Sequence, residues 1–148
     1  MTATQHALDI TAAAARAAAG KLARDIVAFD VSDRLVITDV FLVCSAANDR
    51  QVRAVVDAVQ EQLLDLGAKA VRREGEREGR WVLLDFSDVV VHVQHQDERA
   101  FYALERIWRD CPSLPLPDVD AGDPGGGPDG GPDGGPDGGG GPGGGGGR

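Results

Sequence analysis

The chain has 148 residues and a formal net charge of -9 at pH 7, from 24 acidic and 15 basic side chains. This balance argues against a nucleic-acid-binding protein, because binding to phosphate requires clustered positive charge, and it favours a basic protein as partner. Two cysteines are too few for a disulfide framework, and no run of about 18 apolar residues predicts a membrane span, so we expect a cytoplasmic protein with reduced thiols.

The first predicted element is a helix over residues 3–23. Alanine dominates this segment and is the strongest helix former. Apolar residues at spacings of three and four predict one buried stripe. The predicted stripe consists of Leu8, Ala12, Ala15, Ala19 and Leu22.

Two strands and a second helix follow. Residues 26–31 form the first predicted strand, and the almost continuous apolar run 40–45 predicts a central strand that is covered on both faces. Asn48 is the expected N-cap of the second helix, with Gln51 placed as in a capping box. Gly67 stands where a left-handed C-terminal cap belongs. The predicted buried stripe of this helix is Val52, Val55, Val56, Val59, Leu63 and Leu66.

A short edge strand over 68–73 and a charged loop lead into a predicted hairpin with its turn at residues 87–88. In a two-residue hairpin Val82 faces Val93 and Leu84 faces Val91, which makes one face of the ribbon a core face. The other face mixes aromatic, aliphatic and polar residues, as a protein-binding patch does. That face consists of Trp81, Leu83, Asp85, Val90, His92 and Gln94.

The last predicted element is a helix over 97–109 with Asp97 as its cap. The element order, α-β-β-α-β-β-β-α, predicts a single α/β or α+β domain with a mixed five-stranded sheet. We expect this domain to span residues 1–117. Residues 118–148 form the predicted disordered tail. From Ala121 onward they are almost entirely glycine, proline and aspartate, and no large apolar side chain there offsets the ordering entropy.

Three segments, residues 21–26, 37–43 and 81–93, followed by the Tyr102-x-Leu104-Glu105 spacing, resemble the ribosomal silencing factor family, also called Iojap-like. Ser87 departs from the family pattern, which usually has glycine in this turn. The resemblance implies a nucleotidyltransferase-like topology without catalysis. It also implies binding to ribosomal protein fourteen of the large subunit, which blocks subunit joining and represses translation under nutrient limitation, and a role in large-subunit biogenesis.

The hairpin and the last helix together suggest the partner-binding site. A tryptophan or tyrosine in an interface is the usual source of affinity, and carboxylates pair with a basic partner. Alternatively, Trp81 covers a helix on this face and His92 is a packed core histidine. The predicted partner-binding residues are Trp81, Asp85, His92, Gln94, Arg99, Tyr102 and Glu105, with residues 72–74 as a rim.

Three other functions are less well supported. A nucleotidyltransferase-like enzyme that binds a nucleotide and magnesium needs a Gly-Ser turn and an Asp-x-Asp pair on a strand, whereas the chain has Ser45-Ala46 and no such pair. His92 and His95 lack further metal ligands nearby in sequence. We therefore expect no catalytic residue, cofactor or metal. The same patch also suits a homodimer of the free protein.

Overall fold

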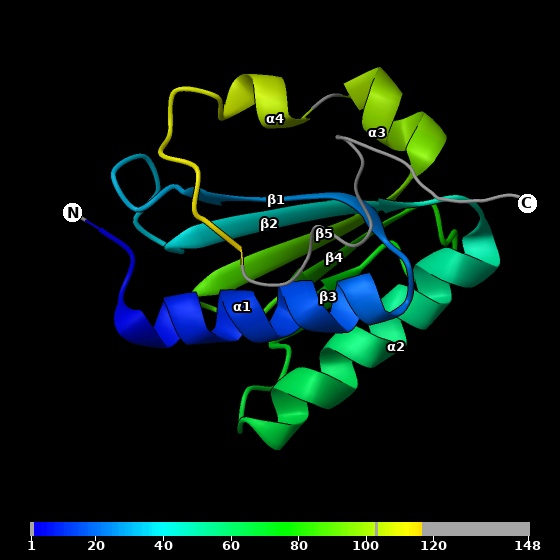
Figure 1. Ribbon diagram of the computed structural model, residues 1–148, viewed down its shortest axis with the longest axis horizontal. Coiled ribbons are helices and arrows are strands. Elements are labelled where there is room, and N and C mark those ends of the chain that lie inside the picture. The colour runs from blue at the N-terminus through cyan, green and yellow to red at the C-terminus, as the bar shows by residue number, and fades with distance from the viewer. Residues whose placement is uncertain (1, 103, 117–148) are drawn as a thin grey trace, which may run out of the picture. The chain divides into compact units, whose positions relative to one another are not determined.

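Five strands form one mixed sheet in the order β1-β2-β5-β4-β3, in a computed structural model that describes residues 2–102 and 104–116, without the side chains of 101–105 (Figure 1). Strands β2 and β5 are parallel, and all other neighbours are antiparallel. The fold is thus a single α+β domain, as predicted, and the predicted tail lies outside these residues. The elements are α1 (Gln5–Gly20), β1 (Arg24–Asp30), β2 (Val40–Ala46), α2 (Asp49–Asp65), β3 (Arg72–Glu74), β4 (Trp81–Asp85), β5 (Val89–His95), α3 (Gln96–Tyr102) and α4 (Leu104–Ile107).

Helices cover the sheet on both sides. Helices α1 and α2 lie together on one side, and α3 and α4 lie on the other (Figure 1). The strand β2 is buried at every position except Phe41, as its continuous apolar run predicts. Among the described residues, no helix is both long enough and apolar enough to cross a membrane.

The predicted caps of α2 are confirmed. The Asn48 side chain accepts a hydrogen bond from the backbone N–H of Gln51 at 2.9 Å, and the Gln51 side chain accepts one from the N–H of Ala47 at 2.6 Å. Gly67 has φ +80°, the left-handed conformation expected of a helix C-terminal glycine. Helix α2 therefore begins and ends where its sequence predicts.

The predicted hairpin register is also confirmed. Val82 pairs with Val93 and Leu84 pairs with Val91, and all four side chains are buried. The turn is closed by a hydrogen bond from the Phe86 N–H to the Val89 carbonyl at 2.9 Å. Ser87 has φ +77°, which explains why its position in the turn favours glycine.

Four local predictions were wrong. Leu66, the last residue of the stripe predicted for α2, is 50% exposed. Of the predicted α1 stripe only Ala15 is buried, whereas Leu22 is 72% exposed, and α1 buries Ala7, Ile10 and Ala14 instead of the other predicted residues. Strand β3 has only three residues rather than six. The single helix predicted over 97–109 corresponds to the two helices α3 and α4, and α3 starts at Gln96 rather than after Asp97.

The two edges of the sheet are protected in different ways. The backbone of β1 pairs with the segment after α4, because Leu114 donates to the Ala28 carbonyl and Asp30 donates to the Pro112 carbonyl, each at 2.9 Å. The other edge, β3, is short and carries charged side chains. Short, charged or covered edges disfavour strand addition, so the face of the sheet is the better candidate for an interaction surface.

Candidate partner-binding surface

Ring contacts place the mixed face of the hairpin on the side of the sheet where Trp108 and α4 lie. The ring of His92 contacts Phe41 on β2, with ring centroids 5.1 Å apart, and Phe41 contacts Trp108, just after α4, at 5.0 Å. Cross-strand pairing places Trp81 opposite Gln94, Leu83 opposite His92 and Asp85 opposite Val90. We call these six residues, Trp81, Leu83, Asp85, Val90, His92 and Gln94, the hairpin face.

Exposure divides the hairpin face between its two strands. The three residues on β4 are half-buried, whereas His92 is 5% exposed and Gln94 is fully buried. Arg99, on α3, is also buried. The predicted site residues therefore form two layers, with Trp81 and Asp85 at the surface and His92, Gln94 and Arg99 beneath it. The side chains of Tyr102 and Glu105 lie outside the described part of the structure.

Trp81 and His92 are joined by a hydrogen bond. The indole Nε1–H donates to His92 Nδ1 at 3.2 Å, and the two rings lie 6.2 Å apart. This bond requires an unprotonated Nδ1. Burial lowers the pKa of His92 from 6.5 to about 4, so the imidazole is neutral at pH 7 and accepts the bond. His92 thus orients Trp81 rather than supplying a charge.

The lowered pKa of His92 predicts a loss of stability in mild acid. Between pH 6.5 and about 4 the unfolded chain binds a proton that the folded chain does not, so stability falls as pH falls through this window. We expect the free energy of unfolding, measured with urea, to decrease by about 2 kcal/mol from pH 7 to pH 5 through this group.

The His92→Gln variant is expected to lose this part of the pH dependence, while His6→Gln, at an exposed position on α1, is expected to keep it. Equal pH profiles for the wild-type chain and His92→Gln would contradict the account of His92.

Asp85 lies at the opposite end of β4 from Trp81 and is held by its neighbours. Its Oδ1 accepts a hydrogen bond from the Ser87 N–H at 2.8 Å, and its Oδ2 lies 3.9 Å from the Arg72 guanidinium. Arg72 also pairs with Glu74 at 3.1 Å. The exposed strand β3 therefore borders β4 with its charged side chains, and its role as the rim of a binding site stays a prediction.

The buried layer of the predicted site contains polar atoms that lack hydrogen-bond partners within the described part of the chain, unlike a well-packed core. Among the described residues, both side-chain polar atoms of Gln94 and Nε2 of His92 are buried without a hydrogen-bond partner. A buried unpaired polar group costs about 1–3 kcal/mol. Sequence positions that cost stability are expected where function selects them, so this layer favours a functional role for the face.

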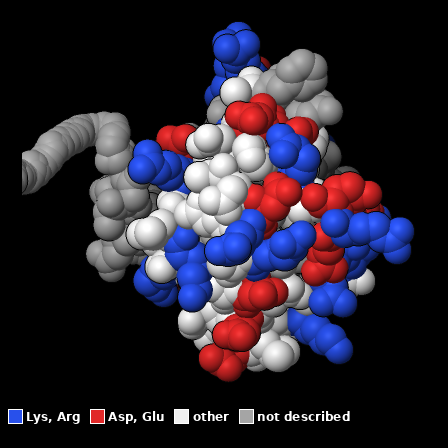
Figure 2. Space-filling model, turned by 90° about the vertical axis from the view of Figure 1, so that its right-hand side faces the viewer, with Lys and Arg blue, Asp and Glu red and all other residues white. Residues whose placement is uncertain are grey.

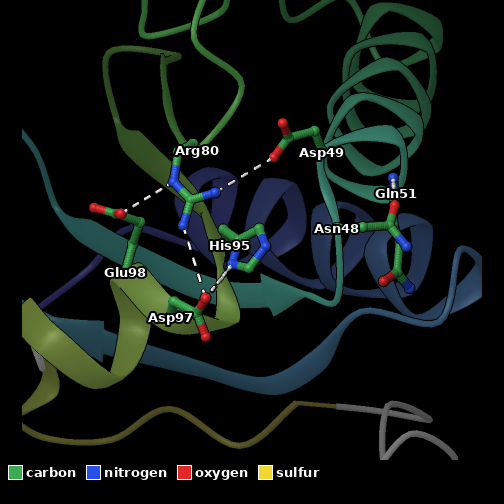
Figure 3. Close-up of polar contacts among 7 residues, drawn as sticks. All are labelled: Asn48, Asp49, Gln51, Arg80, His95, Asp97 and Glu98. Carbon is green, nitrogen blue, oxygen red and sulfur yellow. Dashed lines mark hydrogen bonds and ion pairs between the residues drawn. The ribbon is translucent and has the colours of Figure 1, made fainter.

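A second group of polar residues lies where the parallel strands β2 and β5 end (Figure 3). A cavity of about 550 Å³ is found there, lined by Asn48, Asp49, Arg50, Arg80 and His95. This edge is where open α/β sheets bind ligands, so it tests the nucleotidyltransferase alternative. Within the described residues no group of three His, Cys, Asp or Glu side chains is arranged to hold a metal ion.

Arg80 is the residue that the sequence reasoning missed at this edge. Its guanidinium lies between carboxylates of α2 and α3, which are distant in sequence. The available signal was an arginine directly before the tryptophan of β4, within a charged run that typically forms a solvated loop.

Comparison with known proteins gives a consistent result. A family model described as "Ribosomal silencing factor during starvation" matches residues 4–128. The ribosomal silencing factor RsfS of Bacillus subtilis is 43% identical over 74% of this chain and 90% of its own length. The mouse protein named "Mitochondrial assembly of ribosomal large subunit protein 1" is 29% identical over 58% of this chain and 39% of its own. A crystal structure of a Chromobacterium violaceum protein superposes with a TM-score of 0.67 and 31% identity, over 76% of this chain and 96% of that one.

Proposed function

The chain belongs to the ribosomal silencing factor family, and we propose that it acts on the large ribosomal subunit through its hairpin face. Members of this family bind ribosomal protein fourteen of the large subunit and block subunit joining. They are non-enzymatic, ribosome-binding regulators of translation. The match of the family model to residues 4–128 is the observation that carries this function.

The mechanism is exclusion rather than chemistry. A protein that occupies the joining face of the large subunit lowers the concentration of subunits free to join, in proportion to its own occupancy. Such a mechanism requires one accessible surface with a strong anchor. The hairpin face supports this role because it combines a half-buried tryptophan with a charged rim.

The two layers of the face suggest different roles for the predicted residues. Trp81 and Asp85 are the proposed contacts, because they reach the surface. His92, Gln94 and Arg99 lie beneath and act as supports that fix the surface residues. The roles of Tyr102 and Glu105 stay predictions from the sequence.

Asp85 provides a test of electrostatic recognition. The Asp85→Asn variant keeps the acceptor for Ser87 but removes the charge, so we expect affinity for the large subunit to fall about threefold and its dependence on salt to become weaker. The measurement is the dissociation constant at several ionic strengths. Asp57→Asn, at an exposed position of α2, serves as the matched control, and an unchanged salt dependence in Asp85→Asn would count against a charged contact at this site.

Further aspects of the proposal rest on the sequence and on the family. We place the protein in the cytoplasm and give its fold a nucleotidyltransferase-like topology. A role in large-subunit biogenesis is supported by the name of the mouse relative. A homodimer of the free protein through the hairpin face would compete with the ribosome, and a dimer that stays intact on the large subunit would contradict that arrangement.

A subunit-joining assay tests the function directly. Light scattering follows the association of purified small and large subunits at increasing concentrations of the chain. We expect inhibition when the chain is first mixed with large subunits and little effect when it is added to joined ribosomes. Normal joining at a saturating concentration of the chain would overturn the proposed function, and magnesium-dependent nucleotide incorporation would revive the enzymatic alternative.

A further inference from the structure

One arginine side chain connects the first turns of two helices (Figure 3). Nε of Arg80 donates to Glu98 Oε1 at 3.2 Å. Its Nη1 lies 3.8 Å from Asp49 Oδ1, and its Nη2 lies 3.8 Å from Asp97 Oδ2. Asp49 opens α2, and Asp97 and Glu98 belong to the first turn of α3. Each of the three guanidinium nitrogens therefore faces a different carboxylate, a pattern that the planar arginine fork allows and lysine does not.

The backbone of Arg80 also contacts the junction between β5 and α3. Its carbonyl accepts a hydrogen bond from the His95 N–H at 2.7 Å, at the residue where β5 ends and α3 begins. His95 Nδ1 in turn accepts from the Asp97 N–H at 3.1 Å. This bond gives α3 its N-terminal cap, the role that the sequence had suggested for Asp97 itself. The turn from β5 into α3 is thus fixed to Arg80 through main chain and side chain together.

The charge balance of this edge argues against an anion site in the cavity. Arg80 is already compensated by three carboxylates, and Figure 2 shows acidic and basic side chains interleaved on this side of the molecule. A phosphate would have to displace those carboxylates. The cluster therefore serves an internal connection better than a ligand.

Arg80 and its ion pairs involve two parts of the proposed binding surface, the start of β4 and the start of α3. Arg80 directly precedes Trp81, the proposed anchor, and two of its three partners, Asp97 and Glu98, lie at the start of α3, the helix that carries Arg99. We infer that Arg80 is a positioning residue, which holds α3 against the sheet and so shapes the surface presented to the large subunit. This inference rests on the proposed function, but its effect on α3 can be measured in the free protein.

The effect should be local, because the ion pairs of Arg80 are partly exposed and each contributes little by itself. In Arg80→Ala we expect amide hydrogens of α3 to exchange about tenfold faster, with exchange in the middle of α2 unchanged. We also expect affinity for the large subunit to fall about fivefold, mainly through a slower association rate, since less of the protein holds the competent arrangement.

Three further variants separate positioning from general stability. Arg80→Lys is expected to restore part of both effects. Glu98→Gln, which keeps Arg80, is expected to raise exchange in α3 in the same way and serves if Arg80→Ala does not fold. Arg16→Ala, at an exposed position on α1, is the matched control and should behave as the wild-type chain.

The outcomes distinguish this inference from the proposed function. Unchanged exchange in α3 in both Arg80→Ala and Glu98→Gln would overturn the positioning role of Arg80. Faster exchange with unchanged affinity would overturn its role in recognition. If the wild-type chain fails to bind the large subunit, the proposed function fails, while the exchange experiment still decides whether Arg80 positions α3.

Discussion

Replacing Trp81 with alanine is expected to weaken binding to the large ribosomal subunit by about 30-fold or more, the usual effect of removing a central aromatic anchor. Trp81 is suited to this role because its ring reaches the surface while its indole N–H is held by His92 at 3.2 Å. A side chain that is oriented before binding loses little rotamer freedom when the partner arrives. The dissociation constant is measured by co-sedimentation with isolated large subunits.

Two variants control this experiment. Trp81→Phe keeps an aromatic ring but loses the donor to His92, so an intermediate loss of affinity is expected. Trp108→Phe changes the other tryptophan, which packs against Phe41, and is expected to bind as the wild-type chain. If Trp81→Ala has a native circular dichroism spectrum and undiminished affinity, the assignment of the hairpin face is wrong.

Replacing Gly75 with alanine is expected to lower the free energy of unfolding by about 3 kcal/mol, measured with urea. Gly75 has φ +83°, where a residue with a Cβ is strained by about 1–2 kcal/mol. An added Cβ would also overlap the carbonyl oxygen of Trp81, so the backbone at the start of β4 would have to move. The loop before β4 therefore sets the position of Trp81.

Gly67 provides the matched control for this effect. It has a similar φ of +80°, but an added Cβ would meet no atom within 4 Å. Gly67→Ala should therefore show only the conformational strain, about 1 kcal/mol. Equal losses in Gly67→Ala and Gly75→Ala would show that the contact with Trp81 does not matter.

Local patterns in the sequence predicted most of the fold. The hairpin register follows from strict alternation around a two-residue turn, and the caps of α2 follow from Asn48 and Gly67. The α1 stripe failed because alanine occupies seven of the eight positions 12–19, so no face of this part of the helix is clearly more apolar than another. The face that is buried is then decided by packing against α2, which the α1 sequence does not encode alone.

The sequence predicted which residues share the hairpin face, but it did not predict which of them are buried. Alternation along β4 and β5 places Trp81, His92 and Gln94 on one face, and this part is confirmed. The burial of His92 and Gln94 depends on what packs against this same face of β5, such as α3 and the Phe41 ring, which is a tertiary feature. Arg80 was missed for a similar reason, because its carboxylate partners are separated from it in sequence and meet only in the fold.

Site-specific photo-crosslinking tests the central claim most directly, namely that the hairpin face contacts the large subunit. A benzoylphenylalanine placed at Leu83, half-buried between Trp81 and Asp85 on β4, is irradiated in the complex with large subunits, and the crosslinked protein is identified by mass spectrometry. The same group placed at Arg16 on α1 is the control. The account predicts a crosslink from position 83 to ribosomal protein fourteen and none from position 16. A crosslink to this protein from position 16 but not from position 83 would contradict it.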